Sequence, residues 1–309
     1  MGTKVINCRL PEKTVDELNV LVKRFNLTKS SIIRQALIFF VEMLKNANQI
    51  LVPDFKVNPS KLAINRRHNC TFIRFPNKMV LVLSCISSGS IGPNPMDKLK
   101  VSGFLLGKLT TRAALMDIIS INAWPISIAA TLCVKMDPTG SEIIRGIKTE
   151  MVRADLDPLI LTVDTEENFD TEQTGIGVTI IGLTYEEDLK IGKSQIGDVI
   201  IAVGKPCVGQ EVLEAKSSKE IADLKDIISF LKPDYVHEIM PVDTEGILSK
   251  ANLLAHSIGK NINFYENIKF DLEKSAGPST SVLVTVEKNK VEEFLKYLFK
   301  PYSLIGEIV

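Results

Sequence analysis

The sequence has few of the residues that bind metal ions or form disulfides. Three histidines, His68, His237 and His256, are scattered and give no metal-ligand spacing. Five cysteines are an odd number without a CxxC pair, and they lie in apolar stretches. They indicate reduced, buried thiols and support neither a disulfide framework nor a zinc site. We therefore expect a cytoplasmic protein, and the first residues have no signal-peptide pattern.

The chain also lacks a net charge and a long apolar run. Its 37 basic and 37 acidic residues balance, but residues 1–50 hold eight basic against four acidic residues. The one stretch that suggests a membrane span, Ile118–Val134, has seventeen residues without a charge and is interrupted by Asn122 and Pro125. It is short for a membrane span, so we expect a buried helix that breaks at Trp124-Pro125 and leads into a core strand. No membrane partner is expected.

The N-terminal segment begins with an alternating run, Lys4–Leu10. Successive side chains of a strand point to opposite faces, so Val5, Asn7 and Arg9 share one face and the other face is apolar. An isolated strand leaves its backbone donors and acceptors unpaired. We therefore expect this strand to pair with a partner, and none is close in the sequence.

Two helices are predicted after this strand. Pro11 and Glu12 suit the first turn of a helix that ends at Asn26. Thr28 is the predicted N-cap of a second helix, whose apolar face extends to Leu44. This face is too wide for a segment of this size to bury by itself.

The stretch RLPEKTVDELNVLVKRFNLTKSSIIRQAL resembles ribbon-helix-helix regulators of the Arc, MetJ and CopG type. The resemblance implies a homodimer in which two strands pair and enter the major groove of a palindromic operator in double-stranded DNA. Outward strand residues would read bases, and the turn before the second helix would bind phosphate. Alternatively, Arg9 and Lys29 are solvated residues of a dimerisation module. The implied DNA-binding residues are Val5, Asn7, Arg9, Thr28, Lys29 and Ser30.

Strand and helix patterns alternate beyond a predicted linker over residues 49–60, where Pro53 and Pro59 occur. With residues 1–48 as the ribbon-helix-helix domain, we predict a mixed α/β (α+β) region in two halves, 61–189 and 190–309. The predicted strands are Cys70–Phe75, Met79–Ser84, Ile126–Lys135, Leu159–Val163, Gly177–Leu183, Val199–Val203 and Ser281–Val286. The predicted helices are Gly103–Ser120, Ser218–Leu231, Gly246–Ile258 and Val291–Phe299.

Several stretches of this region resemble the aminoimidazole ribonucleotide synthetase superfamily, which includes thiamine-monophosphate kinase, selenophosphate synthetase and a hydrogenase-maturation enzyme. LVLSCISSG and ALMDIISINAWPISI resemble a core strand and the helix that packs on it. TVDTEENFDTEQTGIGVTIIG resembles an acidic loop followed by a strand, and IGDVIIAVGKPCVGQEV resembles the start of the C-terminal half. The resemblance implies a cleft for ATP and metal ions, and a dimer with a shared barrel.

The match to the binding motifs of this superfamily is incomplete. Arg67–Cys70 replace Gly-Asp-Asp-Ala, Cys85 and Ile86 stand where Thr-Asp is frequent, and Thr162-Val163 replace Gly-Gly. Mg²⁺ needs oxygen ligands, and these replacements remove acidic residues that would supply them. We therefore predict no catalytic residues and leave a metal site undecided. A nucleotide or phosphorylated metabolite, with or without magnesium, is the candidate ligand. The implied ligand-binding residues are Asp117, Asp164, Thr165, Glu166, Thr174 and Gly175.

Two shorter features permit more than one interpretation. Asp164 and Glu166 are equally well explained as solvated loop residues, and the pair His237-Glu238 calls for the same caution. The stretch Lys274–Thr280 is a turn with Ser and Thr side chains that could hold an anion or could only connect two elements.

These patterns predict a prokaryotic, sequence-specific DNA-binding transcriptional regulator. Its synthetase-like domain would sense a small-molecule effector or serve dimerisation. The alternative is an active ATP-dependent kinase or synthetase of the same superfamily that also represses its own gene. A third hypothesis is an antitoxin-type module whose large domain binds a protein.

Overall fold

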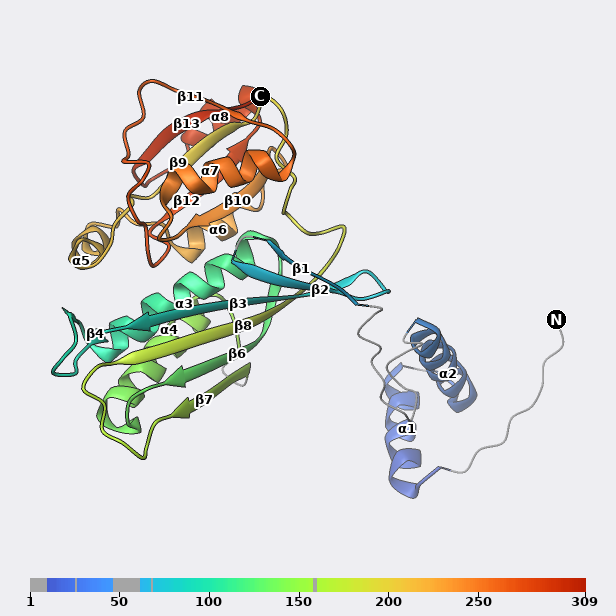
Figure 1. Cartoon of the computed structure of the whole chain (residues 1–309). Coiled ribbons are helices and arrows are strands. Elements are labelled where there is room, and N and C mark those ends of the chain that lie inside the picture. Colours follow the sequence, from blue (N-terminus) through green and yellow to red (C-terminus); the bar gives the residue numbers. More distant parts are fainter. Residues whose placement is uncertain (1–9, 26, 47–61, 68, 158–159) are drawn as a thin grey trace. The chain divides into compact units, whose positions relative to one another are not determined.

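The computed structural model describes residues 10–25, 27–46, 62–67, 69–157 and 160–309. The chain divides into two compact units, Met1–Lys61 and Leu62–Val309. Sheets and helices are mixed in the second unit, which confirms the predicted α/β (α+β) class (Figure 1). In the described ranges, no helix has the length and apolarity that a membrane span requires. A cytoplasmic location stays a prediction.

The described part of the first unit is a helix pair. Helix α1 spans Glu12–Phe25 and helix α2 spans Lys29–Asn46, close to the predicted bounds. The backbone N–H of Ser31 donates to Oγ1 of Thr28 at 3.1 Å, which confirms Thr28 as the N-cap. Except for its last residue, the predicted strand Lys4–Leu10 lies outside the described residues. The ribbon-helix-helix fold therefore stays a prediction for this unit.

A six-stranded sheet in the order β1-β2-β3-β8-β6-β7 begins the second unit. Only the pair β6–β7 is parallel among these neighbours. The strands are β1 (Ala63–Arg67), β2 (Cys70–Arg74), β3 (Met79–Gly89), β6 (Trp124–Leu132), β7 (Leu161–Thr165) and β8 (Gly175–Tyr185). Two short strands, β4 (Ile91–Gly92) and β5 (Leu99–Lys100), pair with each other.

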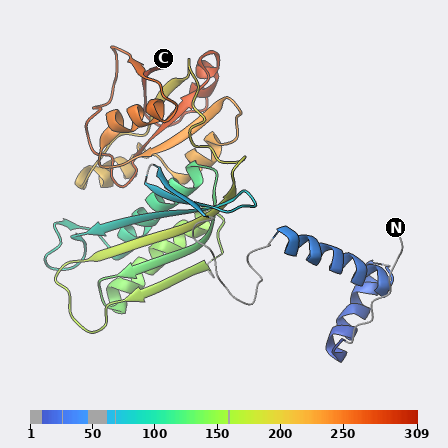
Figure 2. The ribbon, with the colours of Figure 1, turned by 45° about the vertical axis from the view of Figure 1, so that its right-hand side comes forward.

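Helices α3 (Gly103–Ser120) and α4 (Ser141–Arg153) cover one face of this sheet (Figure 1). Burial therefore alternates along β3 and β8, and the buried side chains point to the helices. Helix α3 ends before Trp124-Pro125 and strand β6 follows, as predicted for this uncharged stretch. Within residues 62–309, no described helix covers the opposite face of the sheet (Figure 2).

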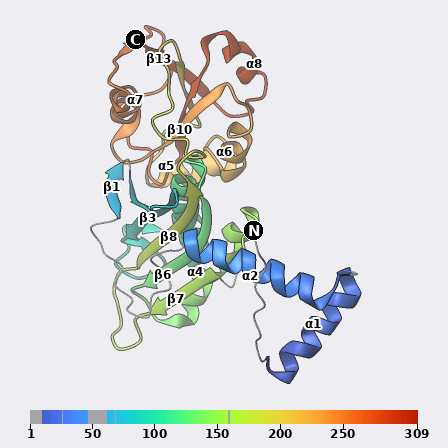
Figure 3. The same cartoon turned by 90° about the vertical axis from the view of Figure 1, so that its right-hand side faces the viewer.

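A five-stranded antiparallel sheet in the order β10-β12-β9-β13-β11 completes the unit. Helix α7 (Gly246–Ser257) covers one face, and α6 (Leu224–Phe230) and α8 (Val291–Leu295) cover the other (Figure 3). Every residue of β9 and β12 is buried, because helices cover both faces of the sheet at these strands. Strands that are buried on both faces have nearly continuous apolar sequences. The strands are β9 (Val199–Val203), β10 (Val236–Val242), β11 (Ile262–Phe264), β12 (Ser281–Val286) and β13 (Tyr302–Ile308).

The segment that joins the two sheets is held by the buried carboxylate of Glu238. It accepts hydrogen bonds from the backbone N–H groups of Gly192, Lys193 and Ser194 at 2.8, 3.1 and 3.2 Å. The Ser194 hydroxyl donates to the same carboxylate at 2.8 Å. Glu238 of the pair His237-Glu238 thus has a structural role.

Some predicted features differ from the structure. The helix predicted over Ser218–Leu231 is wrong at its start, because Lys219 has a left-handed φ of 61° and a capping box at Asp223 begins α6. Helix α5 (Gln210–Ser217) precedes this break. Of the four described cysteines, Cys70 and Cys207 are buried as predicted, whereas Cys85 and Cys133 are exposed.

Candidate ligand-binding site

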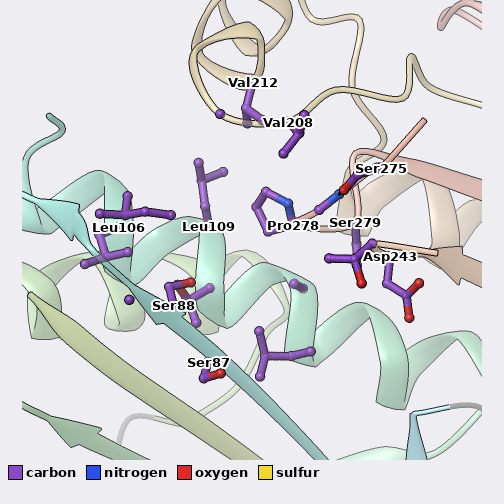
Figure 4. A pocket seen from close by; sticks show the side chains of 18 of the residues that line it. Ser87, Ser88, Leu106, Leu109, Val208, Val212, Asp243, Ser275, Pro278 and Ser279 are labelled. Atoms are coloured by element: carbon purple, nitrogen blue, oxygen red, sulfur yellow. The ribbon is translucent and has the colours of Figure 1, made fainter. Parts of the chain in front are cut away.

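A cavity of about 510 Å³ lies between the first sheet with its helix α3 and the second half of the unit (Figure 4). The end of β3 and the N-terminal half of α3 form one side. The segment around α5 and the loops that follow β10 and precede β12 form the other. The cavity has the size of a typical small-molecule site.

One wall of the cavity is apolar. Helix α3 supplies Leu105, Leu106 and Leu109, which lie on one helical face because they are one and four residues apart. The segment around α5 supplies Val208 and, at the next turn, Val212 and Leu213. Figure 4 shows Leu109 and Val212 on facing sides of the space. This wall would bury the apolar part of a ligand.

Hydroxyl groups and a loop form the polar side. The hydroxyl oxygens of Ser88 on β3 and Thr110 on α3 are hydrogen-bonded at 3.0 Å. The loop Lys274–Thr280 lines the cavity with Ser275 and Ser279 (Figure 4). The stretch that we predicted as an anion-binding turn or a connection therefore belongs to a cavity wall.

Arg112 holds this loop from the other side. It lies on α3, is 3% exposed, and donates from Nη2 to the carbonyl oxygen of Pro278 at 2.9 Å. Burial lowers the pKa of Arg112, and the carboxylates of Asp223 and Glu150 oppose this shift. An arginine stays charged under these conditions. The bond connects the first half of the unit to the loop that lines the cavity.

The carboxylate in the cavity wall, Asp243, is already paired. Lys250 Nζ lies 2.7 Å from its Oδ2, Asn69 donates to Oδ2 at 2.9 Å, and the backbone N–H of Glu245 donates to Oδ1 at 2.9 Å. Burial raises the pKa of Asp243, but the hydrogen bonds from Lys250, Glu245 and Asn69 outweigh it and hold this pKa below its ordinary value. Asp243 is therefore ionised, and its charge is compensated by Lys250.

Asp117, a predicted ligand-binding residue, lies behind the cavity. It is buried in α3, and the Ser84 hydroxyl donates to its Oδ2 at 2.8 Å. Burial raises its pKa from 3.8 to about 7. With Asn69, Cys70 and Lys250 it lines a small hollow, which shares Asn69 with the cavity.

The other predicted ligand-binding residues lie outside the cavity lining. Asp164 and Thr165 end β7, and Glu166 accepts the backbone N–H of Asn168 at 2.7 Å. Thr174 is buried, and its hydroxyl donates to Asp97 at 2.7 Å. Gly175 begins β8. Across the described residues, no group of three or more His, Cys, Asp or Glu side chains could hold a metal ion. The acidic residues that we predicted to bind a ligand therefore do not form a metal site with one another.

The residues that we predicted to contact DNA can be placed only in part. Val5, Asn7 and Arg9 lie outside the described residues. Thr28 caps α2, and Lys29 and Ser30 are exposed in its first turn.

An open hollow with basic side chains adjoins the cavity. Arg66 and Asn69 line both spaces, and the hollow adds Arg67 from β1 and Lys250 and His256 from α7. Its described acidic residue is Glu245, which binds Lys250 at 3.0 Å. Arg66 and Arg67 are exposed, so their positive charges face solvent in this hollow. Apart from the Lys274–Thr280 loop, the residues that line these two spaces were not predicted from the sequence, because the cavity leucines have the same pattern as core residues.

No protein-family model and no curated protein sequence matches the chain. Among solved structures, Escherichia coli HypE, a hydrogenase maturation protein, has a TM-score of 0.55 at 15% identity over 74% of this chain and 79% of its own. Thiamine-monophosphate kinase from Stenotrophomonas maltophilia K279a has 0.54 at 15% identity over 86% and 92%. A HypE structure in complex with ATP has 0.51 at 16% identity over 74% and 76%.

These likenesses show the fold. The synthetase-like fold that the motifs predicted is confirmed, because a maturation protein and a thiamine-monophosphate kinase were the relatives that the resemblance implied. The prediction of a DNA-binding transcriptional regulator is wrong by the same comparison. It depended on the resemblance of the N-terminal strand and helix pair to ribbon-helix-helix regulators, which covers a far smaller part of the chain than the fold of residues 62–309. The comparison favours our alternative, an ATP-dependent kinase or synthetase.

Proposed function

We propose that residues 62–309 form an ATP-dependent kinase or synthetase that acts on a small organic molecule. The observation that carries this proposal is the pair of adjoining spaces that share Arg66 and Asn69. One space is lined mainly by apolar side chains and suits an organic substrate. The other is basic and suits phosphate groups. The names of the similar structures, a kinase and an ATP complex, support the use of ATP.

The basic hollow fits the phosphate end of a nucleotide. The guanidinium groups of Arg66 and Arg67 offer several donors in a planar arrangement that matches phosphate oxygens. Lys250 contributes less, because Asp243 and Glu245 already pair with it. ATP would supply a transferable phosphoryl group at this place. The predicted acidic residues do not gather around a magnesium ion, so we assign no step to a protein-held metal.

Nucleotide binding and ADP release test the proposal. We expect ATP to raise the melting temperature of the full chain, and a panel of small alcohols, amines and acids to contain a compound that stimulates ADP release. The double variant R66A/R67A should weaken ATP binding at least tenfold in calorimetry, because two phosphate contacts are lost. Arg145→Ala removes an exposed arginine of α4 and is the control. Absence of ATP binding by the wild-type chain would refute the proposal.

We also infer that the second unit forms a homodimer through the open face of its first sheet. Leu81 pairs with Leu183, which pairs with Trp124, and Leu83 pairs with Ile181. Cross-strand partners point to the same face, so these side chains form an apolar surface on three adjacent strands. A second copy of the same surface would bury it.

A further inference from the structure

We propose that the cavity binds an uncharged, mainly apolar molecule with one hydrogen-bonding head group. This inference names the substrate class of the proposed function. It rests on the proposed function in one respect, which is that the ligand of the cavity is taken to be the substrate. Binding itself needs no nucleotide and can be tested alone.

The charges around the cavity argue against an ionic ligand. Of its described lining residues, Arg66 and Asp243 carry a charge. Asp243 has its own cation, Lys250, at 2.7 Å, so it does not require a ligand amine. Arg66 stands where the cavity meets the basic hollow. A phosphate inside the cavity would lose water without gaining a compensating cation from the apolar wall, which is unfavourable.

The apolar wall is suited to a hydrocarbon or aromatic body. Leucines of α3 face Val212 and Leu213 of α5, and both sets come from regular helices with fixed side-chain directions. Leu109 is 8% exposed and Val212 is 3% exposed, whereas Val208 is 47% exposed and lies where a ligand could enter. The apolar groups of a ligand that fills this cavity would be removed from water, and this removal favours binding.

The polar side is suited to a neutral head group. In Figure 4, Ser275, Ser279 and Asp243 lie together, away from Leu106 and Val212. The hydroxyls of serine and threonine can donate and accept, so an alcohol, ketone or amide could bond to them without a charge. Because Arg112 fixes the carbonyl of Pro278, the loop that carries these serines is held in place. The separation of apolar and polar sides indicates an amphipathic ligand.

Fluorescence of 1-aminoanthracene, an uncharged probe whose emission rises in apolar surroundings, tests the proposal on the full chain. We expect saturable binding in micromolar probe, displacement by 1-decanol, and at least tenfold weaker displacement by decyl phosphate and by ATP. The two decyl compounds share a chain and differ only in the head group, which is a neutral hydroxyl in one and a charged phosphate in the other. Equal displacement by decyl phosphate or ATP would overturn the proposal, as would the absence of saturable probe binding.

A matched pair of variants locates the site. Val208→Glu places a charge at the cavity wall and should weaken probe binding at least tenfold. Val152→Glu makes the same change on α4, at a residue 67% exposed and outside the cavity lining, and should leave binding unchanged. If Val208→Glu does not fold by circular dichroism, Leu213→Glu serves at the same wall. Unchanged probe binding in a folded wall variant would refute the site. Since direct probe binding is measured without nucleotide, its failure and the failure of ADP release are separate results.

Discussion

Asp117 is a carboxyl group inside the apolar core of the second unit, and its burial sets its protonation. The side chain is 6% exposed. Burial raises its pKa from 3.8 to about 7, the hydrogen bond from Ser84 opposes the shift, and the charge of Asp243 adds to it. Near neutral pH, this group is therefore partly protonated in the folded protein, whereas it is ionised in the unfolded chain.

The pH dependence of stability follows from this shift. The folded state binds the proton of Asp117 more tightly, so the free energy of unfolding should fall as pH rises from about 4 to about 7 and then level off. Asp117→Asn removes this dependence and should raise the free energy of unfolding at pH 8 by about 1–3 kcal/mol. Urea unfolding of the wild type and the variant at pH 5 and pH 8 measures these free energies. Asp188→Asn, at an exposed position, is the control. Identical pH profiles for Asp117→Asn and wild type would contradict the prediction.

Helices α3 and α4 pack at unusually close range because each places a glycine against the backbone of the other. A Cβ on Gly107 would lie 2.2 Å from the carbonyl oxygen of Ile143, and a Cβ on Gly146 would lie 2.1 Å from that of Phe104. Neither distance is possible for real atoms, so any side chain must separate the helices. Since α3 also forms a cavity wall, this contact positions the candidate site.

The substitutions Gly107→Ala and Gly146→Ala should each lower the free energy of unfolding by about 1–3 kcal/mol, the usual cost of overpacking. This loss opposes the gain of about 1 kcal/mol that alanine brings to an isolated helix. Chemical denaturation measures both. Gly89→Ala is the control, because a Cβ there meets nothing within 4 Å, and we expect a change within about 0.5 kcal/mol. A stabilising effect at Gly107 would show that the helices are not in this close contact.

At the element scale, local patterns predicted strands and helices where the periodicity was strong. Helix α3 and strands β9 and β12 have the predicted bounds. Strands β10 and β13 and helix α4 were not predicted. Pro241 interrupts the pattern of β10, and β13 contains Gly306, which pairs at an irregular register. Such residues weaken strand propensity, and the sheet tolerates them because its neighbouring strands and helices bury them.

At the scale of the whole molecule, the open sheet face should decide the oligomeric state. Trp124 is 59% exposed and Tyr185 is 48% exposed on this face. We expect light scattering after size exclusion to give a dimer mass at micromolar concentration. Trp124→Glu should give a monomer, because an unpaired charge would be buried at the interface. Val152→Glu on the helical side should stay dimeric. A monomeric wild-type chain would contradict this prediction.

The sequence by itself determined the mixed α/β class and the likeness of residues 60–309 to the synthetase superfamily, because periodicity and short motifs are local properties. It misled us on function, since the resemblance to ribbon-helix-helix regulators covers only a short N-terminal stretch of the chain. Only the tertiary structure decided the candidate site. Asn69 and Asp243 are hydrogen-bonded across 174 positions, and the loop Lys274–Thr280 meets helix α3 at the cavity. Such contacts arise when distant elements pack together, and no local pattern encodes that packing.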